Sequence, residues 1–463
     1  MLAGLLALPV LIAASAGTGT LIHARGCWSA RVAAGCLLLS GATALLGWAG
    51  LLRPVILWGV LAAGVATFPA ALRKSAPLRW KAAASALVLL LLPALLPQTA
   101  RDAMNHHLYL PRLWLETGAI HRPGWAGFFS YPYMVESLYA LVGGTFGLRC
   151  TGVVSLLGLL AALGVLEGST PGPRRAGLLA AAAWLAAPEV FRNATWAYSD
   201  SFLYLYALLG FIESTSPEPR PWLAGLWAGA AGACKYNGLA ASAAILAILA
   251  VRSGRRMGRT AAGAAVFTAV TLAWALPNLV QWGNPVYPLA RSLLGPPDTL
   301  TSRSRELISA YSDYSSAMEG PLDLLSLPVG VSLFGRWDDP RLFDGASGPL
   351  LLAGAAAFAL AGRRRVRLLV PVMVSLLVAA AGFPAIRVRY LFPGLVMAAP
   401  LAGEGLSAIM DRGRPARIAA FLVVAASIGW SGSWLVRLYA ETEPWRGAGR
   451  DYLVNRLPYM PFY

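Results

Sequence analysis

The sequence predicts an all-α polytopic membrane protein, and three observations lead to this fold class. Of the 463 residues, 57% are hydrophobic and only 13% are charged, and the mean hydropathy is +0.60. The apolar residues form many separate runs of the length that a bilayer core requires. Much of the net charge of +17 lies in arginine-rich loops between these runs. We attribute this charge to membrane topology and expect the lipid bilayer, and no nucleic acid, as a partner.

The apolar runs predict about fourteen transmembrane helices. No Lys or Arg precedes the first run, so it does not have the charged start of a cleavable signal peptide. Several runs in the middle of the chain are short and alternate with polar residues, a pattern that in membrane proteins often surrounds a binding site. The predicted spans lie at about 2–22, 32–50, 55–72, 82–98, 149–167, 177–191, 200–213, 222–234, 238–251, 260–280, 347–362, 367–383, 390–410 and 417–437.

The positive charges predict the orientation of these helices. If the first span ends inside, the short inner loops hold twenty Lys and Arg residues and the short outer loops hold five. Such an excess of cations inside is typical of inserted helices. Residues 99–148 and 281–346 then form two long outer loops. The segment 134–147 is too short to cross a bilayer and is predicted to be an interfacial helix.

The first outer loop holds polar residues that rarely occur beside a membrane without a function. They include Asp102, His106, His107, His121, Tyr131 and Glu136. Asp102 is a candidate general base toward a hydroxyl, although a cap or an ion pair with Arg101 or Arg112 explains it equally well. His106 lies one helical turn further on and could share a face with Asp102.

Other residues of this loop also have two readings. Glu136 is either a hydroxyl-binding acceptor or a charge that suits the first turn of a helix. Tyr131 is either an interface anchor or a surface on which a sugar ring stacks. Asp102, a histidine of the 106–107 pair and His121 could ligate a divalent metal. Histidines spread along a loop are weak grounds, so we do not favour a metal and expect no other cofactor.

Cations in the short outer loops oppose the usual charge bias and therefore need an explanation. Arg387 and Arg389 precede Tyr390 and a predicted span, and Lys235 lies between two short helices. Arginine forms bidentate hydrogen bonds with phosphate oxygens, and lysine adds a positive charge. Arg387, Arg389 and Lys235 could therefore bind an anionic head group. Alternatively they snorkel to the interface or pair with an acid such as Asp200.

An ordered set of motifs resembles a known family. The chain resembles the bacterial membrane glycosyltransferases of the GT-C class that relate to the family 39 mannosyl- and aminoarabinosyltransferases. The matching motifs are Asp102-Ala-Met-Asn-His-His107-Leu-Tyr-Leu-Pro111-Arg112, Phe129-Ser-Tyr-Pro132, Glu136-Ser-Leu-Tyr139, Tyr198-Ser-Asp200, Lys235-Tyr236, Gly283-Asn-Pro-Val-Tyr-Pro288, Phe343-Asp-Gly345, Arg389-Tyr-Leu-Phe-Pro393 and Arg450-Asp-Tyr-Leu-Val-Asn-Arg-Leu-Pro458. The resemblance implies a GT-C-like core at 82–437, with extra N-terminal helices at 1–81 and a short outer tail at 438–463. It leaves the first three spans without a functional account.

The resemblance also implies an activity. Relatives transfer a sugar, with inversion, from a polyprenyl-phosphate donor on the periplasmic face of the bacterial inner membrane. The acceptor is a lipid, a glycan or a protein. The first-loop aspartate, which maps onto Asp102, would deprotonate the acceptor hydroxyl, and the basic groups mapping onto Lys235 and Arg389 would neutralise the leaving phosphate. His106 replaces the tyrosine of the family's Tyr-His pair, so a donor contact of that tyrosine is not expected here.

Site residues follow from these arguments. We assign donor phosphate binding to Lys235, Arg387, Arg389 and Tyr390. We assign substrate binding to His106, His107, Tyr131, Glu136 and Asp200.

Two other classes of function remain open. A lipid-linked polysaccharide polymerase or ligase would depend on external arginine and histidine, and a transporter or flippase would show duplicated halves, which the sequence does not have.

Overall fold

The computed structural model describes residues 2–23, 27–73, 80–123, 127–254, 257–294, 321–362, 364–382, 386–446 and 453. In these ranges the regular structure is helical throughout, with no strand. Seven of the described helices are long and apolar enough to cross a membrane: Leu2–Gly19, Trp28–Trp48, Pro54–Arg73, Leu148–Ser169, Met257–Trp282, Val388–Met410 and Arg414–Arg446. Shorter apolar helices lie at Lys81–Ala94, Gly238–Ser253, Pro349–Leu360 and Val366–Ala381. The chain is thus an all-helical polytopic membrane protein, as predicted.

The chain folds into two compact units, and it passes between them several times. Unit 1 comprises Met1–Val165, Phe191–Leu205 and Val436–Tyr463, and unit 2 comprises Leu166–Val190 and Tyr206–Leu435. The expected domains, 1–81, 82–437 and 438–463, stay a prediction. Residues 1–81 share a unit with the first outer loop, so the first three predicted spans are packed together with the segment that carries Asp102.

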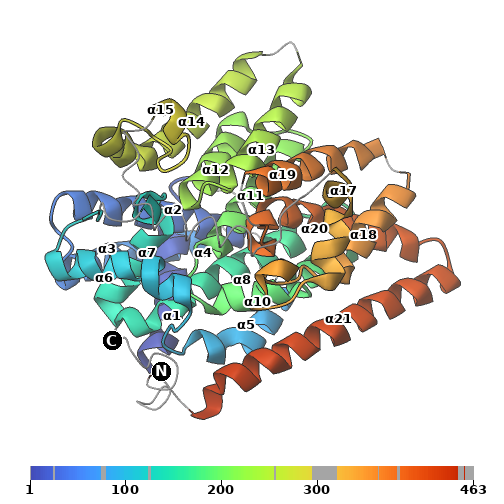
Figure 1. Cartoon of the computed structure of the whole chain (residues 1–463), viewed down its shortest axis with the longest axis horizontal. Coiled ribbons are helices and arrows are strands. Elements are labelled where there is room, and N and C mark those ends of the chain that lie inside the picture. Colours follow the sequence, from blue (N-terminus) through green and yellow to red (C-terminus); the bar gives the residue numbers. More distant parts are fainter. Residues whose placement is uncertain are drawn as a thin grey trace. The chain divides into compact units, whose positions relative to one another are not determined.

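Unit 1 is built around the N-terminal helices, drawn in blue to cyan in Figure 1. Helix α1 packs on α2, α3 and α4, and α7 packs on α2, α3 and α6. The α1–α2 contact depends on small residues, because a Cβ atom on Gly35 would lie 1.7 Å from the carbonyl oxygen of Ser15. The elements are α1 (Leu2–Gly19), α2 (Trp28–Trp48), α3 (Pro54–Ala66), α4 (Phe68–Arg73), α5 (Lys81–Ala94), a π-helical turn (Ala103–His107), α6 (Tyr109–Thr117), 3₁₀ turns (Gly127–Ser130, Leu148–Cys150 and Pro444–Arg446), α7 (Met134–Phe146) and the first part of α8 (Gly152–Ser169).

The helix predicted at 134–147 is present as α7. Its residues from Met134 to Val142 are all buried inside unit 1. Glu136 therefore lies within a packed helix and is fully buried. A buried carboxylate requires a polar partner, and that partner comes from the loop that precedes α7.

Unit 2 holds the remaining helices, drawn in green to orange-red in Figure 1. Helices α12, α13 and α14 pack on one another, and α20 packs on α9, α18 and α19. The elements are α9 (Arg174–Leu185), α10 (Pro188–Thr195), α11 (Asp200–Thr215), α12 (Pro221–Cys234), α13 (Gly238–Ser253), α14 (Met257–Trp282), α15 (Arg291–Leu294), α17 (Pro321–Val329), a π-helical turn (Gly330–Phe334), 3₁₀ turns (Pro340–Leu342 and Arg364–Leu368), α18 (Pro349–Leu360), α19 (Leu369–Ala381), α20 (Val388–Met410) and α21 (Arg414–Thr442). Parts of α10, α11 and α21 belong to unit 1.

Glycines set the closest helix contacts of unit 2. A Cβ atom on Gly225 of α12 would lie 2.1 Å from the carbonyl oxygen of Gly263 in α14. A Cβ atom on Gly403 of α20 would lie 2.2 Å from the carbonyl oxygen of Ala176 in α9. Backbones that approach so closely are typical of membrane helices, where packing and not water drives association.

The structure corrects one predicted span. A single helix is expected at 177–191, but α9 ends at Leu185 and α10 begins at Pro188. Proline has no N–H and is favoured in the first turn of a helix, which explains the break. In the predicted second outer loop, the segment 295–320 lies outside the described residues, and so does most of the tail beyond 446.

Candidate active site

Asp102 precedes a π-helical turn in unit 1. The turn covers Ala103–His107, and the N–H of Leu108 donates to the carbonyl oxygen of Ala103 at 2.8 Å. Single π turns are rare and often occur at functional sites. Asp102 is partly exposed, and the turn places buried His106 and His107 at its end. Helix α6 follows and ends before Gly118, whose φ of +77° suits glycine.

Glu136 holds His107. The Nδ1 atom of His107 lies 2.5 Å from Oε1 of Glu136, and the exposed fractions of the two residues are 4% and 0%. Glu136 occupies the first turn of α7, where the helix dipole also favours a carboxylate. The first-turn position agrees with one of the two explanations given for Glu136, and hydroxyl binding stays a prediction. The pair fixes the imidazole orientation at the end of the π turn.

His106 completes a cluster of predicted substrate-binding residues. Its ring lies 4.6 Å from that of His107 and 5.9 Å, edge-on, from that of Tyr131. The structure therefore brings together His106, His107, Tyr131 and Glu136 within unit 1. Their roles in binding stay predictions.

The same cluster contains a possible metal set. The coordinating atoms of His106, His107 and Glu136 all lie within 4.8 Å of one another. Two imidazoles and a carboxylate are the ligand types of a zinc site, so a divalent cation could be held here. This set differs from the one that the sequence suggests. His121 is exposed, and its carbonyl oxygen accepts from Nε1 of Trp114 at 2.7 Å.

Two tyrosines that the sequence left without a role connect this cluster to the start of α11. The hydroxyl of Tyr139 lies 2.7 Å from Oγ of Ser155 and donates to the carbonyl oxygen of Tyr198 at 2.8 Å. The Tyr198 ring lies 5.5 Å from that of His107. Asp200 follows two residues later at the start of α11 and is fully buried. Both tyrosines belong to the matching motifs, so that signal was available in the sequence.

A second group of residues anchors the start of α7. The Nε1 atom of Trp48 donates to the hydroxyl of Tyr133 at 3.0 Å, and the Arg122 guanidinium lies 5.5 Å from the Tyr133 ring. Burial raises the pKa of Tyr133 to about 12, and the smaller effects of Arg122 and Trp48 oppose that rise. The hydroxyl therefore stays neutral at physiological pH. Tyr133 serves as an anchor three residues before Glu136.

The predicted phosphate-binding residues lie in unit 2, where two cations face one aromatic ring. The Nζ atom of Lys235 and the guanidinium carbon of Arg389 each lie 5.4 Å from the centroid of the Tyr390 ring. Arg389 is buried and Lys235 is half-buried. The two cations are 154 positions apart in the sequence, so tertiary packing places them at the same ring. The N-terminus of α20 adds the positive end of a helix dipole.

A polar network fixes the turn that carries Lys235. Helix α12 ends at Cys234, and Lys235 is extended, with φ −169° and ψ 150°. The next residue, Tyr236, donates its hydroxyl to the carbonyl oxygen of Tyr287 at 2.7 Å. Asn237 donates from Nδ2 to the carbonyl oxygen of Tyr390 at 3.1 Å, which ties this turn to α20. The sequence reasoning missed Asn237, although it directly follows the Lys235-Tyr236 motif.

Arg387 has a different environment from Arg389. Its Nη1 atom lies 3.2 Å from Oδ2 of Asp344, and the N–H of Val388 donates to the carbonyl oxygen of Phe343 at 2.8 Å. Phe343 and Asp344 have φ values of +63° and +47°, a backbone conformation that is strained for residues other than glycine. The pairing identifies Asp344 as the acid beside Arg387, in place of the suggested Asp200. A phosphate contact of Arg387 remains a prediction.

Comparisons with known proteins give a likeness to solved structures but no match by sequence. No family model and no curated protein matches the chain. Among solved structures, the chain is similar to the crystal structure of ArnT from Cupriavidus metallidurans bound to undecaprenyl phosphate. The TM-score is 0.48 at 17% sequence identity, over 81% of this chain and 74% of that chain. The function is therefore inferred from the residues of the two clusters.

Proposed function

We propose that the chain is an inverting glycosyltransferase that moves a sugar from a polyprenyl-phosphate donor to an acceptor hydroxyl on a lipid, a glycan or a protein. The reaction would occur on the outer face of the bacterial cytoplasmic membrane. The observation that carries the proposal is the convergence of Lys235 and Arg389 on the Tyr390 ring. It is supported by the motif resemblance and by the charge bias of the loops.

The cation pair suits a phosphate leaving group. When the bond between the sugar and the phosphate breaks, charge develops on a phosphate oxygen, and positive groups already in place stabilise it. Arg389 can donate two parallel hydrogen bonds to phosphate oxygens, whereas Lys235 acts as a point charge. Tyr390 holds both cations through its ring face. Two like charges at one ring repel each other, so a bound anion would relieve that repulsion.

Asp102 is the proposed general base. It would take the proton of the acceptor hydroxyl as that oxygen attacks the anomeric carbon. The bond from the anomeric carbon to the phosphate oxygen breaks in the same step, and the phosphate leaves with the electron pair. A single displacement of this kind inverts the anomeric centre. His106, Tyr131 and the His107–Glu136 pair would bind the substrate beside the base, and buried Asp200 would support them.

The test is transfer of a radiolabelled sugar in membranes, with a panel of polyprenyl-phosphate sugars as donors. We expect Asp102→Asn to lower transfer by a factor on the order of 10² to 10⁴ while donor binding is retained. Lys235→Gln and Arg389→Gln should weaken donor binding as well as transfer. Glu116→Gln is the matched control, because Glu116 is an exposed carboxylate of the same loop.

Other outcomes would point to other functions. Full transfer by Asp102→Asn would remove its role as base and would favour a polymerase or ligase that uses arginine and histidine. If the wild type transfers no sugar but moves the labelled lipid across the membrane, the protein is a transporter or flippase.

A further inference from the structure

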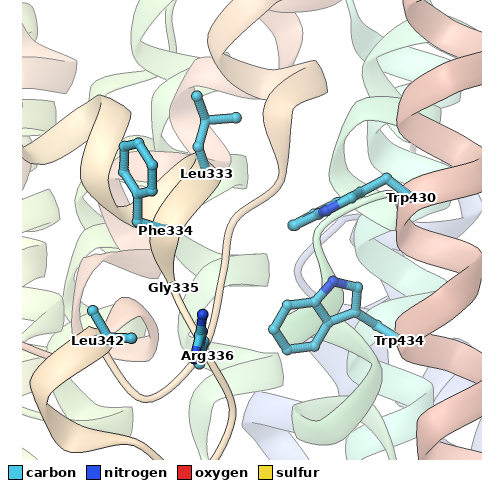
Figure 2. Close-up of a pocket in the computed structure, with 7 residues that line it drawn as sticks. All are labelled: Leu333, Phe334, Gly335, Arg336, Leu342, Trp430 and Trp434. Atoms are coloured by element: carbon cyan, nitrogen blue, oxygen red, sulfur yellow. The ribbon is translucent and has the colours of Figure 1, made fainter.

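A pocket in unit 2 lies outside the clusters described above. Its volume is about 380 Å³, within the range of small-molecule sites. One wall is the segment from Leu333 to Leu342, and the other is the α21 face with Trp430 and Trp434. Figure 2 shows both indole rings projecting from α21 toward that segment. The apolar part of the first wall is exposed, with 62% of Phe334 accessible.

The aromatic wall has the shape of a sugar-binding corner. The rings of Trp430 and Trp434 lie 5.6 Å apart at an interplanar angle of 61°. Trp337 lies 4.9 Å from Trp434 and is buried, so it holds the second ring in place. Two inclined flat faces can contact the C–H face and the edge of one sugar ring. An interfacial aromatic belt would not need such a fixed corner.

The polar side chains of the pocket are hydrogen-bond donors. The Arg336 guanidinium and the two indole N–H groups can donate but cannot accept. With the residues that the structure describes, the guanidinium of Arg336 makes no hydrogen bond or ion pair, and neither indole N–H makes a hydrogen bond. A ligand for this lining must supply acceptors, and a carboxylate or phosphate fits the guanidinium fork.

The wall that carries Arg336 is held firmly. A Cβ atom on Gly335 would lie 1.9 Å from the carbonyl oxygen of Gly345, so the two ends of this loop touch through their backbones. The N–H of Arg336 donates to the carbonyl oxygen of Leu342 at 2.9 Å, which closes the loop. Backbone contacts therefore hold this wall of the pocket in place.

The same loop reaches the proposed phosphate-binding residues. Arg336 and Leu342 of this loop line the pocket. The next two residues contact the start of α20: the carbonyl oxygen of Phe343 accepts from the N–H of Val388, and Asp344 pairs with Arg387. Arg389 follows on the same helix start. A ligand in the pocket and a phosphate at Arg389 would thus share one short structural element within unit 2.

From these observations we propose that the pocket binds an acidic sugar residue of the acceptor, with Trp430 and Trp434 against the ring and Arg336 on its carboxylate or phosphate. The role as acceptor subsite rests on the proposed function. The binding of an acidic sugar does not, because it follows from the donors and rings of the pocket.

The test measures binding to the purified full chain in detergent by saturation-transfer difference NMR. Glucose 6-phosphate is the probe and glucose is its neutral counterpart. We expect glucose 6-phosphate to bind, and Arg336→Gln and Trp434→Leu each to weaken it by about tenfold or more. Arg341→Gln, an exposed arginine of the same loop outside the pocket, should bind as the wild type does. Arg336→Lys should recover part of the affinity.

Several results would overturn the inference. They are failure of glucose 6-phosphate to bind the wild type, equal binding by Arg336→Gln, and equal binding of glucose. A further arm places the protein in nanodiscs of phosphatidylglycerol or phosphatidylcholine. If phosphatidylglycerol alone abolishes binding, the pocket takes a phospholipid head group and the sugar assignment is wrong.

The binding assay separates this inference from the proposed function. If glucose 6-phosphate binds through Arg336 but no donor of the panel supports transfer, the proposed function fails and the sugar site stands. If transfer occurs and Arg336→Gln leaves the KM for the acceptor unchanged, the pocket is not the acceptor subsite.

Discussion

At the scale of single residues, the carboxylate of Glu136 is fully buried and lies against the imidazole of His107. Its contact with His107 joins the π turn to α7. A buried carboxylate with a good partner stabilises a fold only as long as that partner remains. The pair therefore makes the geometry of the histidines and the stability of unit 1 depend on each other.

We predict that Glu136→Gln lowers the free energy of unfolding by about 1 to 3 kcal/mol, because a charge-assisted hydrogen bond in the core becomes a neutral one. SDS titration in mixed micelles, followed by circular dichroism, measures the change. Glu116→Gln removes an exposed carboxylate paired with Arg112 and should cost less than about 0.5 kcal/mol. Equal costs for the two variants would show that the His107 contact does not stabilise the fold.

The candidate site was predictable as a set of residues but not as a set of contacts. Asp102, Lys235 and Arg389 stand out because charge beside apolar runs is rare. The partners of His107 and Arg387 are 29 and 43 positions away in the sequence, and only tertiary packing decides such pairs. Asp344 could not be chosen over Asp200 for the same reason. The catalytic and binding roles themselves remain predictions.

At the scale of elements, glycine positions determine how closely the helices approach. Gly403 lies where α20 meets α9, and α20 also carries Arg389 at its start. The contact therefore sets the position of the helix that presents the phosphate-binding residues. In contrast, Gly429 of α21 has open space where a side chain would be.

Gly403→Ala should destabilise the protein by about 1 to 3 kcal/mol, since its new Cβ atom meets the backbone of Ala176 and α20 must shift. Gly429→Ala is the matched control and should be neutral or more stable by up to about 1 kcal/mol, as expected for alanine inside a helix. The same SDS titration compares the two. A neutral Gly403→Ala would mean that the two helices can separate without loss.

Helices were predictable from hydropathy, and their interruptions were less so. Each predicted span overlaps a helix, because a run of apolar residues in a bilayer has no alternative to intrahelical hydrogen bonds. The break before Pro188 was readable from the proline itself, yet the hydropathy continues through it. The π turn at Ala103–His107 has no hydropathy signal, since its register depends on what His106 and His107 contact.

At the scale of the whole molecule, the distribution of charge predicts which side of the membrane each loop occupies. Thr117 at the end of α6 belongs to the predicted outer loop, and Glu218 between α11 and α12 belongs to a predicted inner loop. Both side chains are exposed. They therefore report the two sides of the membrane directly.

Thr117→Cys should react with a membrane-impermeant maleimide in intact spheroplasts, whereas Glu218→Cys should react only after permeabilisation. Cys27→Ser provides the background, because Cys27 is half-exposed and the other three cysteines are buried. The measurement is the labelled fraction by gel shift. The reverse pattern would invert the orientation and would place the loop with Asp102 in the cytoplasm.

The π turn after Asp102 also limits how this segment can evolve. A π turn contains one residue more than an α turn, and each residue rotates an α-helix by about 100°. Deleting a single residue between Asp102 and His107 would restore a regular helix and would swing the histidines away from Glu136. A change in length would therefore disturb this segment more than a substitution between Asp102 and His106 would. In a lineage of such chains, the spacing between the aspartate and the second histidine should therefore be inherited more strictly than the residues between them.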